Sequence, residues 1–247
     1  MPSLAVIGHL SRDVVAGGAP SIGGGPWHAA RALAALGADA VVVAACGAAD
    51  EGAFRAELEA RAVPIELHVG ETTTAFSFSY DASGSRTMTV DAIGEPFAPD
   101  VDADWVQVAP LLRGDVAVPR ARHVLLDGQG LVRRPRLGPL VLDSDYDRDA
   151  LRGVSILKLA KEEAAVVGPV DVPELVVTDG LRGATVNGTH IAADPVDADP
   201  TGAGDMFAAG YLAARAAGAE PVEAGRSAAA LVSNLLSDKL SQGRTSP

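Results

Sequence analysis

The sequence predicts an α/β fold with a central, mainly parallel sheet covered by helices on both faces. Three observations lead to this prediction. Short apolar runs alternate with Ala-rich amphipathic stretches, the runs are bounded by Gly, Pro or Asp, and 48% of the 247 residues are hydrophobic. A chain of this length and composition can bury a full-sized core. We therefore expect residues 1–247 to form a single domain.

The predicted strands are short, rich in Leu or β-branched residues, and flanked by turn-forming residues. They are Leu4–Ile7, Ala40–Ala44, Val106–Ala109, His123–Leu126, Leu140–Leu142, Ile156–Leu159 and Leu175–Thr178. Sheets of this kind bind ligands at the carboxyl ends of their strands, so the site is expected there.

The predicted helices are the longer amphipathic stretches between these strands. They are Pro26–Leu36, Glu51–Ala62, Lys161–Val167, Ala203–Ala217 and Val222–Ser237. The alternation of strands and helices is what favours a parallel sheet over an antiparallel one.

A different pattern occurs at about residues 72–92. Thr74–Tyr80 places three aromatic residues on one face and two serines on the other, residues 81–85 are turn-forming, and Arg86–Val90 alternates again. This pattern predicts a β-hairpin. With one apolar face, the hairpin is either a lid over the site or a dimer surface, or else an antiparallel edge of the main sheet.

The charge and targeting signals restrict the function classes. The chain has 20 basic and 32 acidic residues, a net charge of −12, which argues against nucleic-acid and anionic-membrane partners. No signal peptide or membrane-length apolar run is apparent, so we expect a cytoplasmic protein. We also expect it to be a monomer or homodimer. The single cysteine, Cys46, lies in an apolar run and is expected to be a buried hydrophobe.

The most informative stretch is Asp199-Pro-Thr-Gly-Ala-Gly-Asp205, directly before an apolar helix. Gly202, Ala203 and Gly204 have little or no side chain, so their backbone N–H groups can approach a ligand closely. A helix N-terminus favours an anion, and this geometry suits a phosphoryl group in transfer. We expect these three residues to form an anion hole.

Asp205 follows in the first turn of the same helix. A carboxylate repels phosphate, so its position suits a general base that takes a proton from an attacking hydroxyl. The alternative is that Asp205 only complements the helix dipole.

Residues Asp199–Gly210 resemble the second signature of the PfkB (ribokinase-like) carbohydrate kinase family, and four further segments match that family in order. These are Ile7-Gly8 with Asp13, Gly23–Ala30, Leu157–Glu163 and Val176–Gly183. The resemblance implies a three-layer α/β/α sandwich with a small β lid, and an ATP-dependent, Mg²⁺-using kinase with Asp205 as the base.

The resemblance also implies roles for other residues. Asp13, Gly24, Gly25 and His28 would bind the substrate. The nucleotide would lie against Thr178, Gly180 and Gly183, with Lys158 and Arg182 as the best-placed basic residues and Asn234 near the adenine. Glu163 would act on Mg²⁺ through water, and Asp199 lies where some members help bind a monovalent cation such as K⁺.

Three departures from the family pattern stand out. Ala160 and His28 each stand where many members have Asn, and the stretch between Asp13 and Gly23 is short, so the lid should be reduced and rest mainly on the hairpin. Together with Thr72–Thr74 and Ser233-Asn234-Leu235, these features resemble the inositol-kinase branch.

The sequence therefore favours a kinase that phosphorylates a hydroxyl of a small polyol or sugar, with a myo-inositol-like acceptor preferred. Two alternatives stay open. One is a nucleoside or ribose-type kinase, and the other is a homologue that binds a sugar or nucleotide without catalysis, which Ala160 and the short lid suggest.

Overall fold

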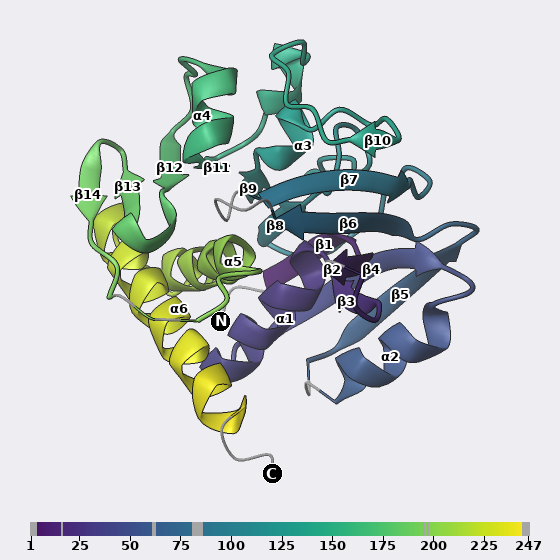
Figure 1. Cartoon of the computed structure of the whole chain (residues 1–247). Helices are drawn as coiled ribbons and strands as arrows, with labels where there is room; N and C mark the ends of the chain where they lie inside the picture. Colours follow the sequence, from purple (N-terminus) through teal and green to yellow (C-terminus); the bar gives the residue numbers. More distant parts are fainter. Residues whose placement is uncertain are drawn as a thin grey trace.

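The computed structural model describes residues 4–15, 17–60, 63–80, 86–194, 196 and 198–243. Within these residues it has two sheets, a nine-stranded main sheet and a five-stranded smaller sheet that lies beside it (Figure 1). No helix among them is long and apolar enough to cross a membrane.

The main sheet is parallel except at one edge. Its strand order is β14-β13-β12-β11-β9-β8-β1-β4-β5, and only the β12–β13 and β13–β14 pairs are antiparallel. In chain order the strands are β1 (Leu4–His9), β4 (Ala40–Gly47), β5 (Ile65–Gly70), β8 (Trp105–Ala109), β9 (His123–Asp127), β11 (Ile156–Ala160), β12 (Glu174–Thr178), β13 (Ala184–Val186) and β14 (Thr189–Ile191). The predicted parallel α/β sheet is confirmed.

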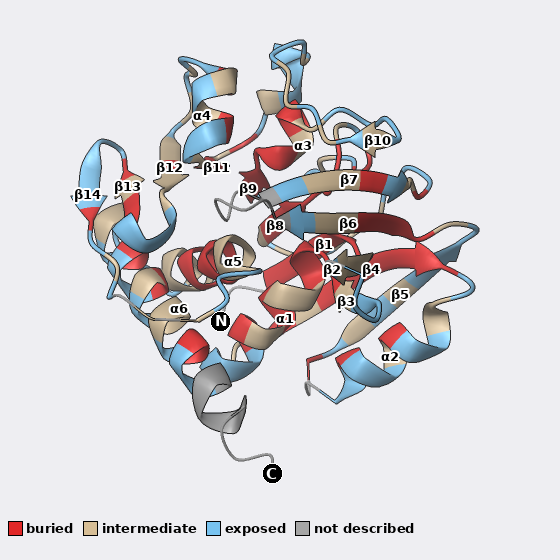
Figure 2. Cartoon of the chain, viewed as in Figure 1, coloured by how far each residue is buried: buried red, intermediate tan, exposed pale blue. Residues whose placement is uncertain are grey.

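Helices cover both faces of this sheet. The helices are α1 (Gly25–Leu36), α2 (Glu51–Glu59), α3 (Gln129–Val132), α4 (Lys161–Val167), α5 (Ala203–Ala216) and α6 (Pro221–Gly243), and the short 3-10 turns are η1 (Arg148–Leu151) and η2 (Gly180–Arg182). One hydrophobic core lies under α1, α2, α5 and α6, and a second lies under α3 and α4. Figure 2 shows the buried residues concentrated in the central strands and along α5.

The smaller sheet has the order β10-β7-β6-β2-β3 and forms the lid. Its strands are β2 (Ser11–Val15), β3 (Ser21–Gly23), β6 (Thr74–Tyr80), β7 (Arg86–Ala92) and β10 (Gly138–Pro139). The predicted hairpin is β6–β7, and it belongs to this sheet and not to an edge of the main sheet. Its predicted turn, residues 81–85, lies outside the described residues.

Two sequence-based expectations about these elements differ from the structure. The short stretch after β1 still forms two lid strands, β2 and β3, although the hairpin contributes the two longest strands of the lid, as expected. The predicted main-sheet strand Leu140–Leu142 is wrong. Leu140 donates its backbone N–H to the carbonyl of Met88, and Leu142 makes only an isolated bridge. This apolar run does not join the main sheet because it packs against the lid and against the core under α3 and α4.

Candidate active site

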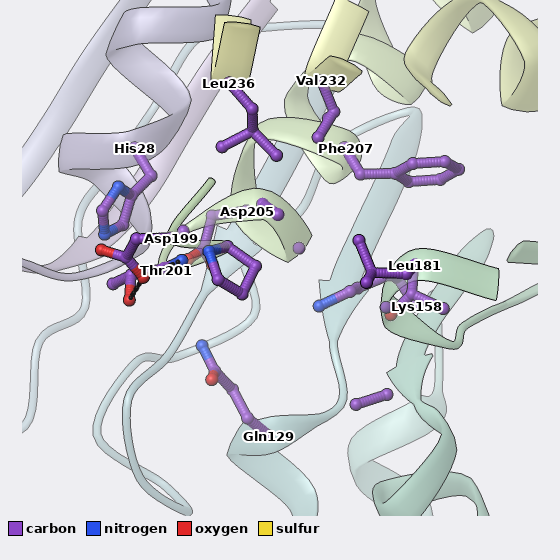
Figure 3. Close-up of a pocket in the computed structure, with 18 of the residues that line it drawn as sticks. His28, Gln129, Lys158, Leu181, Asp199, Thr201, Asp205, Phe207, Val232 and Leu236 are labelled. Atoms are coloured by element: carbon purple, nitrogen blue, oxygen red, sulfur yellow. Dashed lines mark hydrogen bonds between the residues drawn. The ribbon is translucent and has the colours of Figure 1, made fainter. Parts of the chain in front are cut away.

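A cavity of about 570 Å³ lies where the carboxyl ends of the main-sheet strands face the lid and the start of α5. Its walls come from β2, the lid hairpin, α1, the ends of β11 and β12, residues 193, 194, 196 and 199–205, and α6. Figure 3 shows His28, Asp199 and Thr201 on one side of this space, Gln129 and Lys158 on another, and Val232 and Leu236 on a third. The predicted ligand position at the strand ends therefore coincides with a cavity.

Gly202 precedes α5 in a left-handed conformation, with φ +80°. The ring of His28, from α1, packs so closely that a Cβ on Gly202 would overlap it. Both the backbone angle and the contact require glycine at this position. The N–H of Ala203 donates to the carbonyl of Pro200 at 2.9 Å, so of the three residues predicted to form an anion hole, only Gly202 and Gly204 have a backbone N–H that is not committed to this turn. Both border the cavity.

Asp205 lies in the first turn of α5 and lines the same cavity. Its Oδ1 lies 3.2 Å from the place where a Cβ on Gly25 would be, so the bare backbone of α1 leaves room beside this carboxylate. Burial raises the pKa of Asp205 above its ordinary value, although the charges of Lys158 and Arg133 oppose the shift. A raised pKa makes the ionised carboxylate a better proton acceptor.

Lys158 and Asp127 form a buried ion pair at the floor of the cavity. The Lys158 Nζ lies 2.8 Å from Asp127 Oδ2, and the two side chains are 8% and 1% exposed. Burial raises the pKa of Asp127 to about 6 despite the neighbouring ammonium. Burial also acts to lower the pKa of Lys158, but the nearby carboxylates outweigh it and hold that pKa above its ordinary value. The same Nζ lies 3.0 Å from the place of a Cβ on Gly204, so the ammonium lies beside the glycines at the start of α5.

Glu163 is buried at the start of α4. Its Oε2 accepts the backbone N–H of Ala160 at 2.8 Å, and its Oε1 lies 3.4 Å from Nη2 of Arg133. Glu163 lines the cavity, and each of its carboxylate oxygens has a partner within the protein.

The cavity is lined by all four residues that the sequence assigned to the substrate, namely Asp13, Gly24, Gly25 and His28. Gly24 adopts φ +96°, and a Cβ there would overlap the carbonyl of His9. The lid closes this side with Phe76, Phe78 and Met88. The wall therefore combines one carboxylate and one imidazole with an apolar cover.

The cavity is also lined by some of the residues predicted to bind the nucleotide. Thr178, Gly180 and Gly183 line the cavity, whereas Arg182 and Asn234 do not. Arg182 is exposed and donates hydrogen bonds to Asp179. The hydrogen bonds from Arg182 and Lys161 hold the pKa of Asp179 well below its usual range.

Asn234 lies on the exposed face of α6, one helical position away from Ser233, which does line the cavity. The apolar side chains on this side are Leu181, Val196, Phe207, Val232 and Leu236. They make this part of the cavity wall apolar.

Asp199 also lines the cavity. Its Oδ1 accepts both the backbone N–H and the hydroxyl of Thr201, at 3.0 Å and 2.7 Å. In the described part of the chain this carboxylate therefore shapes the loop that leads into Gly202. A role in binding a monovalent cation stays a prediction.

Six polar residues that line the cavity were not predicted as site residues: Ser11, Gln129, Arg133, Asp194, Thr201 and Ser233. Gln129 and Arg133 are the two that come from the centre of the main sheet. Gln129 begins α3 and Arg133 directly follows it, after β9. The only available signal was position: both come soon after a buried strand, at the edge where such sheets bind ligands. They match no motif, so nothing in the sequence singled them out.

Comparisons with known proteins agree with this geometry. Residues 144–243 match the pfkB family carbohydrate kinases. An inositol 3-kinase from Zea mays is 37% identical over 105 residues, which cover 37% of this chain and 27% of that protein. The match thus spans about a quarter of the curated relative.

Solved structures match over nearly the whole chain. A pyrophosphate-dependent kinase of the ribokinase family, complexed with a pyrophosphate analog and myo-inositol, superposes with a TM-score of 0.82 at 21% identity and covers 95% of both chains. The nucleoside kinase of Methanocaldococcus jannaschii gives a TM-score of 0.69 at 19% identity, covering 96% of this chain and 92% of that one. The ribokinase-like fold is confirmed.

Proposed function

Because this chain has the ribokinase fold and a pfkB-family carbohydrate kinase sequence over residues 144–243, we propose that it is a kinase that phosphorylates a hydroxyl of a small polyol or sugar. The single observation that carries the proposal is the position of Asp205. It stands beside the anion hole, between a cavity wall suited to an acceptor and a wall suited to a phosphate donor.

In the proposed reaction, Asp205 accepts the proton of an acceptor hydroxyl as that oxygen attacks the terminal phosphorus of the donor. The space beside Gly25 admits the hydroxyl to the carboxylate. The N–H groups at Gly202 and Gly204 stabilise the negative charge on the phosphoryl oxygens, because they are already oriented and cost no rearrangement.

The donor side fits ATP with Mg²⁺. The apolar slot formed by Leu181, Val196, Val232 and Leu236 suits a base, and Glu163 offers a carboxylate oxygen. Mg²⁺ in such sites keeps several waters and uses one or two carboxylates with substrate phosphates, which fits a single water-bridged Glu163. When bound, the ion would neutralise charge on the donor phosphates. Free pyrophosphate is the alternative donor, since the relative with a TM-score of 0.82 is pyrophosphate-dependent.

A myo-inositol-like acceptor is favoured. Asp13 and His28 can hydrogen-bond hydroxyl groups, while Phe76, Phe78 and Met88 offer an apolar surface for the C–H face of a ring. The maize relative is an inositol 3-kinase, and the pyrophosphate-dependent relative was solved with myo-inositol. The same aromatic lid could stack on a nucleobase, so a nucleoside acceptor is the second candidate.

The test is a product assay with myo-inositol, ribose and adenosine as acceptors, and ATP or pyrophosphate as donor. We expect phosphorylated inositol from the wild type and none above background from Asp205→Asn, which keeps the shape but removes the base. A matched control is Asp171→Asn, the same change at an exposed aspartate that does not line the cavity, and it should retain activity. Full activity of the Asp205 variant would refute the role of this residue. Ligand binding without product from any acceptor would support the non-catalytic alternative.

A further inference from the structure

Asp115 is a buried acid that does not line the cavity and that the proposed reaction does not use. Its Oδ2 accepts the backbone N–H groups of Leu111 and Leu112, each at 2.9 Å. Its Oδ1 is buried without a hydrogen-bond partner in the described part of the chain. Burying a carboxylate costs free energy unless hydrogen bonds replace the lost water, so what this residue provides is the geometry of the loop after β8.

The main chain of Asp115 joins this loop to two other parts of the fold. Its carbonyl oxygen accepts the N–H of Phe97 at 2.7 Å and lies 3.1 Å from Nε2 of His9, the last residue of β1. Because a carbonyl only accepts, this ring nitrogen carries a proton and donates it. Phe97 belongs to the segment that leaves the lid after β7, and its own carbonyl accepts the N–H of Ala117 at 2.8 Å. Asp115 thus connects the loop after β8 both to the main sheet and to the chain leaving the lid.

The two leucines that Asp115 holds lie under the lid. Leu111 and Leu112 are buried, and they share a hydrophobic cluster with Phe76 of β6 and Val90 of β7. Leu111 and Phe76 also line the cavity. A shift of the two leucines would therefore move the apolar cover that the lid places over the cavity.

The loop that Asp115 holds begins close to Asp205. β8 ends at Ala109, and the place of a Cβ on Gly25 is 2.5 Å from the Cβ of Ala109 and 3.2 Å from Oδ1 of Asp205. Leu111 follows Ala109 by two residues, so it comes directly after the space proposed for the acceptor hydroxyl. The residues predicted to bind the nucleotide follow β12, and β11 and β9 separate β12 from β8 in the sheet.

We propose that Asp115 is a positioning residue for the acceptor and acts by fixing Leu111 and Leu112 under the lid, which rests on the proposed kinase function. Its carboxylate touches neither the substrate nor the reacting atoms. It holds the apolar lid at the distance from the base that an acceptor ring requires, and a misplacement of about 1 Å is enough to impair such a site. Other elements hold the donor, so donor binding should not respond.

The test is steady-state kinetics of Asp115→Ala and Asp115→Asn, with myo-inositol and the donor varied separately. Alanine accepts neither backbone N–H, so KM for myo-inositol should rise about tenfold or more, as expected for the loss of hydrogen bonds to a charged group. Both kcat and the donor KM should stay within about twofold, since only binding of the acceptor is weakened. Asparagine keeps one oxygen for the two N–H groups and should restore the wild-type KM.

The matched control is Asp147→Ala. The Asp147 carboxylate also accepts a backbone N–H, that of Asp149 at 2.9 Å, but it is exposed and does not line the cavity. Its kinetic constants should match those of the wild type.

Hydrogen–deuterium exchange of the free protein provides a readout that needs no ligand. In Asp115→Ala, the amides of β6 and β7 should exchange faster than in the wild type, while those of β4 and β9 in the main sheet should not. Faster exchange confined to the lid supports the proposal. Lid exchange like that of the wild type, or a rise in acceptor and donor KM alike, would overturn it, because the first shows no effect on the lid and the second a general structural defect.

The remaining outcomes separate this inference from the kinase proposal. If alanine prevents folding, Asp115→Ser keeps one shorter acceptor, should give a smaller rise in the acceptor KM, and decides by the same comparison. A wild type that phosphorylates no acceptor would refute the kinase proposal, and calorimetry with myo-inositol then decides the role of Asp115. Weaker binding to Asp115→Ala than to the wild type supports that role, and equal binding, or none by the wild type, overturns it.

Discussion

Replacing Gly202 by alanine should cost more stability than an equivalent change elsewhere, because two separate effects add at this position. Gly202 has φ +80°, and a left-handed conformation costs a residue with a Cβ about 1–2 kcal/mol. The new methyl group would also overlap the ring of His28. Displacing a packed side chain costs about 1–3 kcal/mol. The free energy of unfolding should therefore fall by about 2–5 kcal/mol.

Gly218→Ala is the matched control, since Gly218 has φ +94° but no atom lies within 4 Å of the place where a Cβ would be. It should lose only the conformational part, about 1–2 kcal/mol. The assay is urea unfolding followed by far-UV circular dichroism, with the unfolding free energies of the two variants compared. Equal losses would show that the His28 contact does not restrict Gly202, and the account of the loop before α5 would then be wrong.

Three further predictions concern buried ionisable groups. Lys158→Met should lower the free energy of unfolding by about 3–5 kcal/mol, because it leaves Asp127 buried and unpaired. Adding Asp127→Asn to this variant should recover most of the lost free energy in urea unfolding. No recovery would mean that the two residues of the pair are not coupled. Because a base acts only when deprotonated and burial raises the pKa of Asp205, kcat/KM should fall with decreasing pH from a point above the ordinary aspartate value of 3.8. A pH–rate profile flat down to that value would contradict this. Cys46 is 2% exposed, and burial raises its pKa to about 11, so a thiol reagent at about pH 8 should label it only after unfolding. Rapid labelling of the native protein would show that the surroundings of Cys46 in β4 open to solvent.

Local patterns predicted most of the main sheet. The short apolar runs at β1, β4, β8, β9 and β11 were recognisable because both of their faces are largely buried. The edge strand β5 was missed because its residues alternate between half-buried and exposed before ending in an exposed run. Leu140–Leu142 is the opposite case, because it was predicted to be a strand and is not one. An apolar run can pack against the core without joining the sheet.

The residues of the cavity also divide into those that local sequence patterns indicated and those that the sequence misplaced. Gly202, Asp205 and His28 were recognisable because the helix start and its glycines are set by neighbouring residues. Arg182 and Asn234 were placed at the nucleotide by sequence position. The structure puts Arg182 on Asp179 and Asn234 on the exposed face of α6. A helix position only one residue away points in a different direction, which the sequence alone does not reveal.

By itself, the sequence determined the α/β class, the hairpin and the glycine-rich start of α5, because each depends on residues close together in the chain. Only the tertiary structure decided what stands opposite Asp205. Asp127 and Lys158 are 31 residues apart in the chain, and Arg133 meets Glu163 over a separation of 30. Their charges act on one another because the parallel pairing of β9 with β11 places these strand ends side by side in a buried environment, where electrostatic interactions are poorly screened.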